Sequence, residues 1–285
     1  MNGIDISRWQ NIDLTDVPCD FVIVKATQGV SYISPRFVEQ ITQADRLGKY
    51  LGVYHYAGGG GAMAEAEHFL KTVKGYINRA ILCLDWEGEQ NPNFNSPTYA
   101  LAFLAYIKQQ TGITPFIYMS KSVCRQYAKQ WDASYPLWMA QYKSFAQTGY
   151  QTDPWTDKKG YGPWNGCKIH QYSSRGRLPG FKGDLDLDLA YMDGSEWMRW
   201  ASGDLCPETP VTQTDEKPLL KKGMQNEYVR AWQTFLNLNG YQCGVADGIF
   251  GNRTQAAVKA YQKAHGLKAD GIIGPKTWAS LPMMQ

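Results

Sequence analysis

Short apolar, β-rich runs recur along residues 1–200, and amphipathic helical patterns separate the earlier runs. Strands that alternate with helical connections are typical of a parallel sheet, and eight of them can close that sheet into a TIM-like barrel. The later connections are rich in Gly, Pro and Trp, so we expect loops there and an irregular α/β barrel whose last strands lack helices. The expected strands are Gly3–Ser7, Phe21–Thr27, Leu51–Ala57, Ile81–Glu87, Pro115–Ser120, Leu137–Tyr142, Cys167–Ser173 and Leu185–Tyr191, and the expected helices span residues 35–48, 62–75, 96–111 and 121–130.

A polar segment rich in Pro and Thr, residues 201–217, has no apolar periodicity and is predicted to be a linker. It separates a large first domain, residues 1–200, from a tail, residues 218–285. The first segment is long enough for a barrel-sized domain and the tail for a small domain, so both can fold independently.

The tail contains an internal repeat, since DGIFGNRT at residues 247–254 recurs as DGIIGPKT at residues 270–277. Asp-Gly pairs form tight turns, and the Thr that ends each copy can cap a helix. The tail is therefore predicted to be a small all-α domain of three helices. These are expected at Asn226–Leu238, at Thr254–His265 and from Thr277 onward.

Charge is unevenly distributed along the chain. The net charge is +3, and residues 218–285 hold eight Lys or Arg against three Asp or Glu. A basic tail beside a mildly acidic first domain suits an anionic polymer, such as bacterial cell wall or nucleic acid. Nucleic acid is the poorer candidate, because the basic residues are spread along helices without a recognition motif, and we expect no nucleic-acid partner.

The six cysteines are scattered, with no CxxC pair and no Cys/His cluster. We therefore expect no metal site, no cofactor and mostly free thiols, as in a protein made in a reducing compartment, although a Cys206–Cys243 bridge stays open. The N-terminal MNGIDISRWQ places Asp5 and Arg8 where a classical signal peptide has apolar residues. No run reaches the ~20 apolar residues of a membrane span, so we expect a cytoplasmic product without a span. The oligomeric state is left open.

Strand after expected strand ends in a charged or hydrogen-bonding side chain. In TIM-like barrels the active site lies at the carboxyl ends of the strands, so a series of polar ends predicts a site there. These residues are Asp5, Ser7, Lys25, His55, Asp85, Glu87, Tyr118, Gln141, Gln171 and Asp186.

Two carboxylates stand together in ILCLDWEGE, residues 81–89. Residues two apart on a strand face the same side, so Asp85 and Glu87 are expected to project together, with Cys83 and Ile81 beneath them. Close carboxyl groups resist joint ionisation, which raises the pKa of one of them. A glycosidase needs such a pair, a protonated acid beside an anion, but the pair alone is equally compatible with an acidic loop or a metal-ligand pair.

Two further acids extend this site across the barrel. Asp5 ends the first strand and Asp186 lies in the last one, and these strands are neighbours in a closed barrel. Both acids are therefore expected to flank a cleft shared with Asp85 and Glu87. Asp184 and Asp188 share a face with Asp186, and spacing does not decide which of the three points into the cleft.

Eight segments of residues 1–200 match a known pattern in order: GIDISRWQ, FVIVKATQGVSYISPRF, GVYHYA, LDWEGE, FIYMS, LWMAQY, HQYSS and GDLDLDLAY. With them, residues 1–200 closely resemble glycoside hydrolase family 25, the Chalaropsis-type lysozymes. The tail, with VRAWQTFLNLNGY and DGIFGNRTQAAVKAYQKAHGLKADGIIGPKTW, resembles a common peptidoglycan-binding module. The combination resembles a phage endolysin or an autolysin that acts on the cell wall after phage-type release.

The resemblance implies a (β/α)5β3 barrel that cleaves the β-1,4 bond between N-acetylmuramic acid and N-acetylglucosamine in bacterial peptidoglycan. It implies Glu87 as general acid/base and Asp85 as the group that orients the 2-acetamido group for attack on the anomeric carbon, with retention of configuration. Asp5 and Asp186 are implied to position the sugar or to tune Glu87. The candidate substrate-binding residues are Tyr56, Tyr118, Trp138 and Gln171.

One position departs from the family pattern, because the motif that usually reads KATEG reads KATQG here and puts Gln28 where an acid is common. The alternatives are a glycosidase of another N-acetylated glycan such as chitin, and a non-catalytic wall-binding protein on a barrel scaffold. The wall-type tail argues against the first. The retention of all four acids argues against the second.

Overall fold

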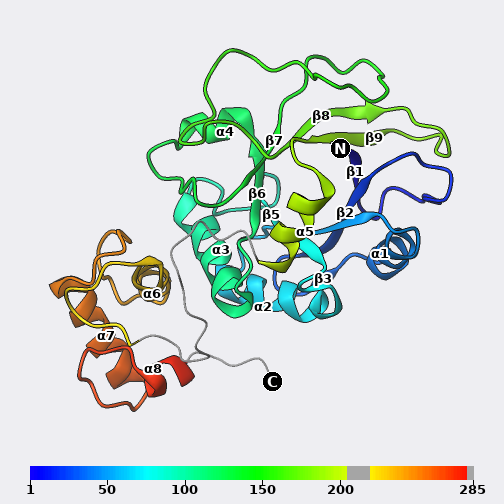
Figure 1. The fold of residues 1–285 in the computed structure, drawn as a ribbon. Coiled ribbons are helices and arrows are strands. Elements are labelled where there is room, and N and C mark those ends of the chain that lie inside the picture. Colours follow the sequence, from blue (N-terminus) through cyan, green and yellow to red (C-terminus); the bar gives the residue numbers. More distant parts are fainter. Residues whose placement is uncertain (204–218, 281–285) are drawn as a thin grey trace. The chain divides into compact units, whose positions relative to one another are not determined.

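The computed structural model describes residues 1–203 and 219–280, which form two compact units, Met1–Cys206 and Pro207–Gln285 (Figure 1). Most of the expected linker, and with it Cys206, lies outside the described residues. The five other cysteines are free thiols. Among the described residues, no helix is both long and apolar enough to cross a membrane.

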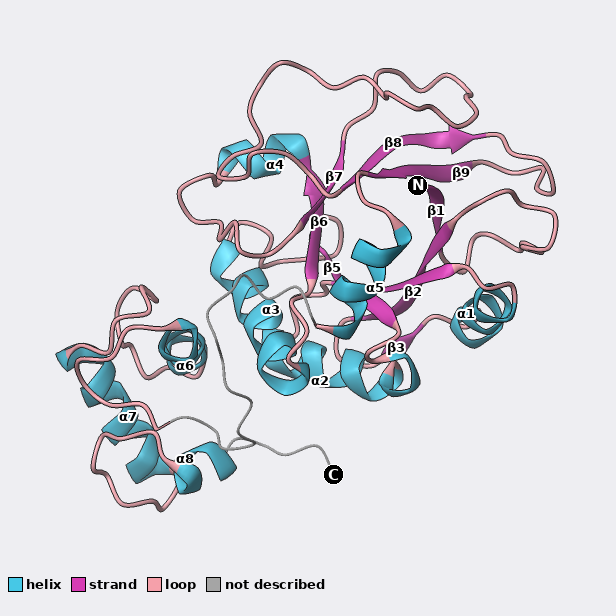
Figure 2. Ribbon diagram, in the orientation of Figure 1, coloured by secondary structure: helices cyan, strands magenta, loops and turns pink. Residues whose placement is uncertain are grey.

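The first unit is a closed eight-stranded barrel (Figure 2). Its strands follow the order β1-β9-β8-β7-β6-β5-β4-β2, and β1 closes the ring by pairing in parallel with β2. The last strand, β9, runs antiparallel to both of its neighbours. The strands are β1 (Asn2–Ile6), β2 (Phe21–Gln28), β4 (Tyr50–Tyr56), β5 (Ala80–Asp85), β6 (Phe116–Ser120), β7 (Leu137–Ala140), β8 (Ile169–Gly176) and β9 (Leu185–Ala190), and a two-residue strand, β3 (Tyr32–Ile33), pairs with the end of β2.

Alternation along each strand separates two apolar cores. In β2, Val22 and Val24 face outward and pack with the surrounding helices, whereas Phe21 and Ile23 fill the barrel interior. The same alternation in β5 puts Ile81 and Cys83 inside the barrel, so Asp85, two residues further along, continues the inward-facing row. The barrel interior is thus apolar below and acidic at the carboxyl ends of the strands.

Helices cover the outside of the first half of the barrel, and one helix covers its base. That helix, α5, has its Trp197 ring 4.6 Å from the ring of Phe21, and the indole N–H donates to the carbonyl of Leu51. Both partners lie at the amino ends of their strands, so α5 seals the end of the barrel opposite the acids. The helices of this unit are α1 (Phe37–Arg46), α2 (Ala62–Thr72), the 3-10 helix η1 (Lys74–Tyr76), α3 (Pro97–Thr111), α4 (Lys121–Gln126) and α5 (Gly194–Ser202).

The second unit contains α6 (Glu227–Leu238), α7 (Asn252–Ala264) and α8 (Pro275–Ala279) around its own apolar core. A buried glutamine binds each copy of the repeat. The Gln233 amide donates to Asp247 Oδ1 (2.9 Å), to the Ile249 carbonyl (3.0 Å) and to Thr254 Oγ1 (2.9 Å), while its oxygen accepts from Gly248 N (2.8 Å).

Gln262 makes the same four contacts with the second copy. They are Asp270 Oδ1 (3.0 Å), the Ile272 carbonyl (2.9 Å), Thr277 Oγ1 (3.1 Å) and Gly271 N (2.9 Å). The repeat detected in the sequence is therefore half of a unit whose other half is a glutamine in the preceding helix.

The structure confirms the expected irregular barrel followed by a helical tail. All eight expected strands are present, and the long connection between β7 and β8 is a loop, as expected (Figure 2). Two details differ. The strand that carries the acid pair ends at Asp85, so Glu87 lies just beyond it, and α5 was not expected from the sequence.

Candidate active site

The four acids expected to form the site lie together at the carboxyl end of the barrel. Asp5 of β1 and Asp186 of β9 are direct partners in the antiparallel register. Asp85 ends β5, and Glu87 follows in the loop. Glu87 is close enough to all three aspartates for its charge to raise their pKa values. Barrel closure therefore gathers residues that are remote in the sequence into one acidic cluster.

A fifth acid, Asp188, lies in the same cluster and is fully buried. Its Oδ1 accepts the indole N–H of Trp138 at 2.8 Å, and its carboxyl group lies close enough to that of Asp5 to share a proton with it. Two buried carboxylates this close repel each other when both are ionised, so the pair favours a state in which one of them is protonated. Asp5 also accepts from the Gln171 amide at 2.6 Å.

The three aspartates at positions 184, 186 and 188 thus have different environments, which distinguishes them where spacing did not. Asp188 is buried deep in the interior and Asp186 lies beside Asp5 nearer the mouth. Asp184 is partly exposed and forms ion pairs with Arg177 and, at 3.7 Å, with Arg175. Asp184 is therefore bound at the barrel surface and not in the cluster.

Burial raises the pKa of every acid in the cluster, and the neighbouring negative charges add to the rise. The pKa of Asp5 is well above its ordinary value, and that of Asp186 rises to about 8. Burial also raises the pKa of Asp188, to about 7, although the Trp138 N–H and the bond with Asp5 oppose the rise. Several of these groups consequently hold protons near neutral pH.

Asp85 and Glu87 respond to the same causes. Burial and then the charge of Glu87 raise the pKa of Asp85, and Lys25 opposes the rise. Burial and then the charge of Glu89 raise the pKa of Glu87, and Lys25 again opposes it. The pair can therefore hold one proton and one charge near neutral pH, with Lys25 favouring the charge.

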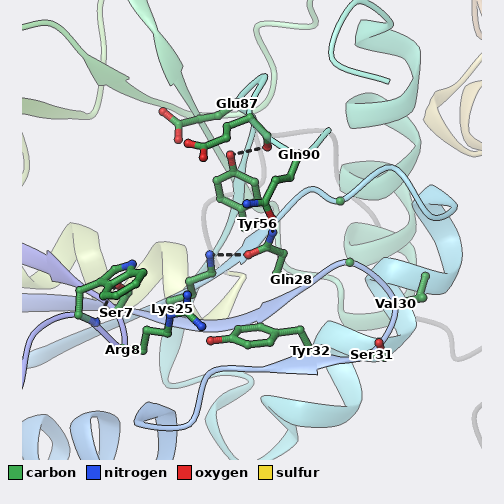
Figure 3. Close-up of a pocket in the computed structure, with 14 residues that line it drawn as sticks. Ser7, Arg8, Lys25, Gln28, Val30, Ser31, Tyr32, Tyr56, Glu87 and Gln90 are labelled. Atoms are coloured by element: carbon green, nitrogen blue, oxygen red, sulfur yellow. Dashed lines mark hydrogen bonds between the residues drawn. The ribbon is translucent and has the colours of Figure 1, made fainter. Parts of the chain in front are cut away.

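A pocket of about 600 Å³ opens beside this cluster (Figure 3). Glu87 and Gln90 line one side, Arg8 and Tyr32 line the other, and Lys25 and Gln28 lie between them. A pocket of this size is within the roughly 300–1,000 Å³ of typical small-molecule sites. The remaining lining residues are Ser7, Trp9, Gly29, Val30, Ser31, Tyr56, Gly58 and Glu89.

The Gly-rich loop after β4 forms part of the pocket wall and is held in place from below. Buried Glu65 accepts from the backbone N–H groups of Gly58 (3.0 Å) and Gly60 (2.7 Å) and is bound by His55 Nε2 (2.9 Å). A Cβ at Gly58 would lie 2.8 Å from Gly29 Cα, so only glycine permits this close approach. The loop is thus an anchored wall.

The four candidate substrate-binding residues divide into two groups. Tyr56 lines the pocket and donates its hydroxyl to the Glu89 carbonyl at 2.7 Å. Tyr118, Trp138 and Gln171 are 6%, 2% and 4% exposed and lie beneath the acids. They form a hydrogen-bonded layer there. Tyr118 donates to Gln171 Oε1 at 2.8 Å, and Tyr142 donates to the same oxygen. Gln171 in turn donates to Asp5, and Trp138 donates to Asp188.

Sequence reasoning missed several residues of the pocket. Arg8 and Trp9 lie in the loop after the first strand, and Tyr32 is at the start of β3. The GIDISRWQ motif contains Arg8 and Trp9, but no periodicity indicates that the loop folds over the mouth. In the sequence, Asp188 is one of three aspartates that share a face, and only its burial in the structure distinguishes it from Asp184 and Asp186.

A closed barrel with paired carboxyl groups beside a pocket at its carboxyl end has the arrangement that a glycoside hydrolase uses. Residues 4–181 match the model of glycosyl hydrolases family 25, and residues 225–281 match that of a putative peptidoglycan binding domain. The chain belongs to glycosyl hydrolase family 25.

Individual relatives agree with this assignment. The autolytic lysozyme of Clostridium acetobutylicum is 26% identical over 281 residues, which cover 97% of this chain and 77% of that protein. A bacterial lysozyme from Streptomyces coelicolor superposes with a TM-score of 0.58 at 24% identity, covering 71% of this chain and 97% of its own. The catalytic domain of endolysin ply40 from bacteriophage P40 of Listeria monocytogenes gives 0.55 at 22% identity, covering 71% and 97%. At these identities the two structures support the fold.

Proposed function

We propose that this chain is an N-acetylmuramidase, a lysozyme that cleaves the β-1,4 bond between N-acetylmuramic acid and N-acetylglucosamine in bacterial peptidoglycan. The observation that carries the proposal is the gathering of Asp5, Asp85, Glu87 and Asp186 beside one pocket at the barrel mouth. Family membership and the match of the tail to a peptidoglycan-binding model support it.

In the proposed mechanism, Glu87 is the general acid. Its raised pKa keeps it protonated at a pH where an ordinary glutamate is ionised, and it lines the pocket. Glu87 donates its proton to the glycosidic oxygen as the bond to the anomeric carbon breaks. The ionised Glu87 then accepts a proton from the water that completes hydrolysis.

Asp85 is proposed to act on the 2-acetamido group of the muramic acid. As an anion, which nearby Lys25 favours, it accepts the acetamido N–H and makes the carbonyl oxygen a better nucleophile toward the anomeric carbon. The cyclic intermediate forms on one face of the sugar and water opens it from the other, so the configuration is retained. Asp5 and Asp186, whose pKa values respond to the charge of Glu87, are proposed to position the sugar.

The buried layer of Tyr118, Trp138 and Gln171 is proposed to position acids and not to contact sugar. Each donates a hydrogen bond within the cluster, and none of the three is among the residues that line the pocket. Tyr56 is proposed to contact substrate, because its side chain lines the pocket.

The domain division proposed is a catalytic barrel over residues 1–200, a linker over 201–217 and a wall-binding module over 218–285. The place of action is the bacterial cell wall, with phage-type release as the proposed route, in line with the structural similarity to a bacteriophage endolysin domain.

Glu87→Gln tests the proposal. We expect loss of wall lysis with unchanged folding and wall binding, because the amide cannot transfer a proton to the glycosidic oxygen. Turbidity clearing, circular dichroism and wall pull-down measure the three properties, and near-normal clearing by the folded variant refutes the role of Glu87. Reducing-end analysis of wild-type digests should show new muramic acid ends, and new glucosamine ends refute the bond assignment.

A further inference from the structure

The pocket has two ends of opposite charge. Glu87 lines one end, near enough to Glu89 for their charges to interact. Arg8 and Tyr32 line the other end, which we call the cationic end, and Lys25 lies between the two (Figure 3). Trp9 lies beneath the Arg8 guanidinium. A sugar whose glycosidic bond lies at Glu87 fills the acidic end. The cationic end is then available to whatever projects from that sugar.

Arg8 keeps its charge available to a ligand. Its guanidinium carbon lies 4.3 Å above the Trp9 ring and 6.0 Å from the Tyr32 ring. Within the ranges 1–203 and 219–280, no carboxylate forms an ion pair with Arg8. Aromatic rings orient a guanidinium without neutralising it, so its hydrogen-bond donors remain free for an anion.

Lys25 adds a second cation between the two ends. Its Nζ lies 4.4 Å from the centre of the Tyr56 ring and donates to Gln28 Oε1 at 2.9 Å. Gln28 is itself oriented by a bond from its Nε2 to Gln90 Oε1 at 3.0 Å. The hydrogen-bond acceptor of Lys25 is thus a neutral amide, although the ammonium also interacts with the charges of Asp85 and Glu87. A carboxylate at position 28 would pair with the ammonium directly and reduce the positive potential further.

We propose that the cationic end binds the carboxylate carried by the 3-O-lactyl substituent of N-acetylmuramic acid, either the lactyl carboxylate itself or a carboxylate of the peptide stem attached to it. The inference rests on the proposed function. Among the sugars of the glycan, only muramic acid bears an acidic substituent, so this end recognises the residue that chitin lacks. Arg8 forms a charge-assisted hydrogen bond with the carboxylate, and Lys25 attracts it without direct contact being required.

The test compares two soluble substrates made from the same peptidoglycan. One is sonicated glycan that keeps its peptide stems, and the other is the same glycan after amidase treatment, which leaves free lactyl carboxylates. Arg8→Gln and Gln28→Glu are measured in the full chain, with Arg199→Gln as the matched control. Arg199 is exposed on α5, the helix at the opposite end of the barrel.

We expect Arg8→Gln to raise KM about tenfold with kcat retained, since a charge-assisted hydrogen bond at an exposed site has that effect. Gln28→Glu should raise KM in the same direction, and Arg199→Gln should match the wild type. A rise confined to the stem-bearing glycan assigns a stem carboxylate, and a rise confined to the amidase-treated glycan assigns the lactyl carboxylate, which is free only after the amide bond to the stem is cleaved. A rise on both substrates shows that the cationic end binds whichever of the two carboxylates is present. The effects should shrink at high salt.

Unchanged KM on both substrates, in Arg8→Gln and Gln28→Glu variants with wild-type melting temperatures, overturns the inference. A wild type that cleaves neither substrate contradicts the proposed function instead. The two failures are therefore distinguishable.

Discussion

Asp188→Asn isolates the energetic cost of the buried carboxyl cluster. The amide keeps both contacts of the aspartate, because its oxygen can accept from Trp138 and its nitrogen can donate to Asp5. What the substitution removes is the proton equilibrium. Burial raises the pKa of Asp188 from 3.8 to about 7 in the folded protein. Between these values the folded state binds more protons than the unfolded state, so stability falls as the pH rises.

The pKa shift corresponds to about 4 kcal/mol at a pH above both values, as an upper limit. We therefore expect Asp188→Asn to match the wild type near pH 4 and to exceed it in stability by about 2–4 kcal/mol at pH 8. At roughly 2–4 °C per kcal/mol, the barrel transition should melt several degrees higher.

Calorimetry of the full chain at pH 4, 6 and 8 measures this difference. The control is Asp184→Asn, which changes a partly exposed aspartate just before the same strand that is ion-paired to Arg175 and Arg177. Its effect should be the same at pH 6 and pH 8, because it removes surface ion pairs outside the buried cluster. Equal pH dependence of the wild type and Asp188→Asn would show that Asp188 does not carry a proton in the fold, and would refute the reasoning.

Three further outcomes are expected. Lys25→Met should move the basic limb of the pH profile of kcat to higher pH, because Lys25 lowers the pKa of both Asp85 and Glu87. Measured pH-rate profiles of the wild type and the variant check this shift, and a basic limb that stays in place or moves to lower pH contradicts the prediction. Glu65→Leu should destabilise the barrel by about 3 kcal/mol or more and raise KM, because it leaves the N–H groups of Gly58 and Gly60 and the His55 ring without their acceptor. Chemical denaturation measures the stability and steady-state kinetics measure KM, with Glu67→Leu on the same helix as the comparison. Gln262→Leu should destabilise the tail by about 3 kcal/mol and weaken wall pull-down, because four hydrogen bonds of the second repeat are lost. Hydrolysis of soluble glycan should be unchanged, and its loss would contradict the independence of the two units.

Strand positions could be predicted from sequence because they depend on local patterns. Alternation and β-rich composition located all eight barrel strands within a few residues, and the inward row of Ile81, Cys83 and Asp85 follows from a period of two. Helix α5 was missed because its segment has four apolar or aromatic residues next to a polar linker, and its partners are strand ends more than a hundred residues away.

The sequence could predict which acids come together in the cluster, but not how deeply each of them is buried. Adjacency of the first and last strands follows from barrel closure, which placed Asp5 beside Asp186. Whether Asp188 is buried depends on Trp138 and Gln171, which come from two other strands. The same long-range packing buries Trp138, a candidate substrate-binding residue, and directs its N–H to Asp188.

The glutamines of the tail show a different limit. Gln233 and Gln262 have identical contacts, but the loops that lead from them to Asp247 and Asp270 differ in length, so a search for a fixed period finds the Asp-Gly segments alone.

The barrel tolerates its acids because the two ends of its interior are specialised. At the base, Trp197, Phe21 and Phe116 are fully buried and sealed by α5, and burial of such rings stabilises the fold by about 2–3 kcal/mol each. At the mouth, five carboxyl groups would be prohibitive if all were ionised, and shared protons together with the N–H donors of Trp138 and Gln171 lower that cost. A raised pKa is thus both the condition for folding around the acids and the property that general acid catalysis by Glu87 requires. Stability and activity should consequently decline together as the pH rises.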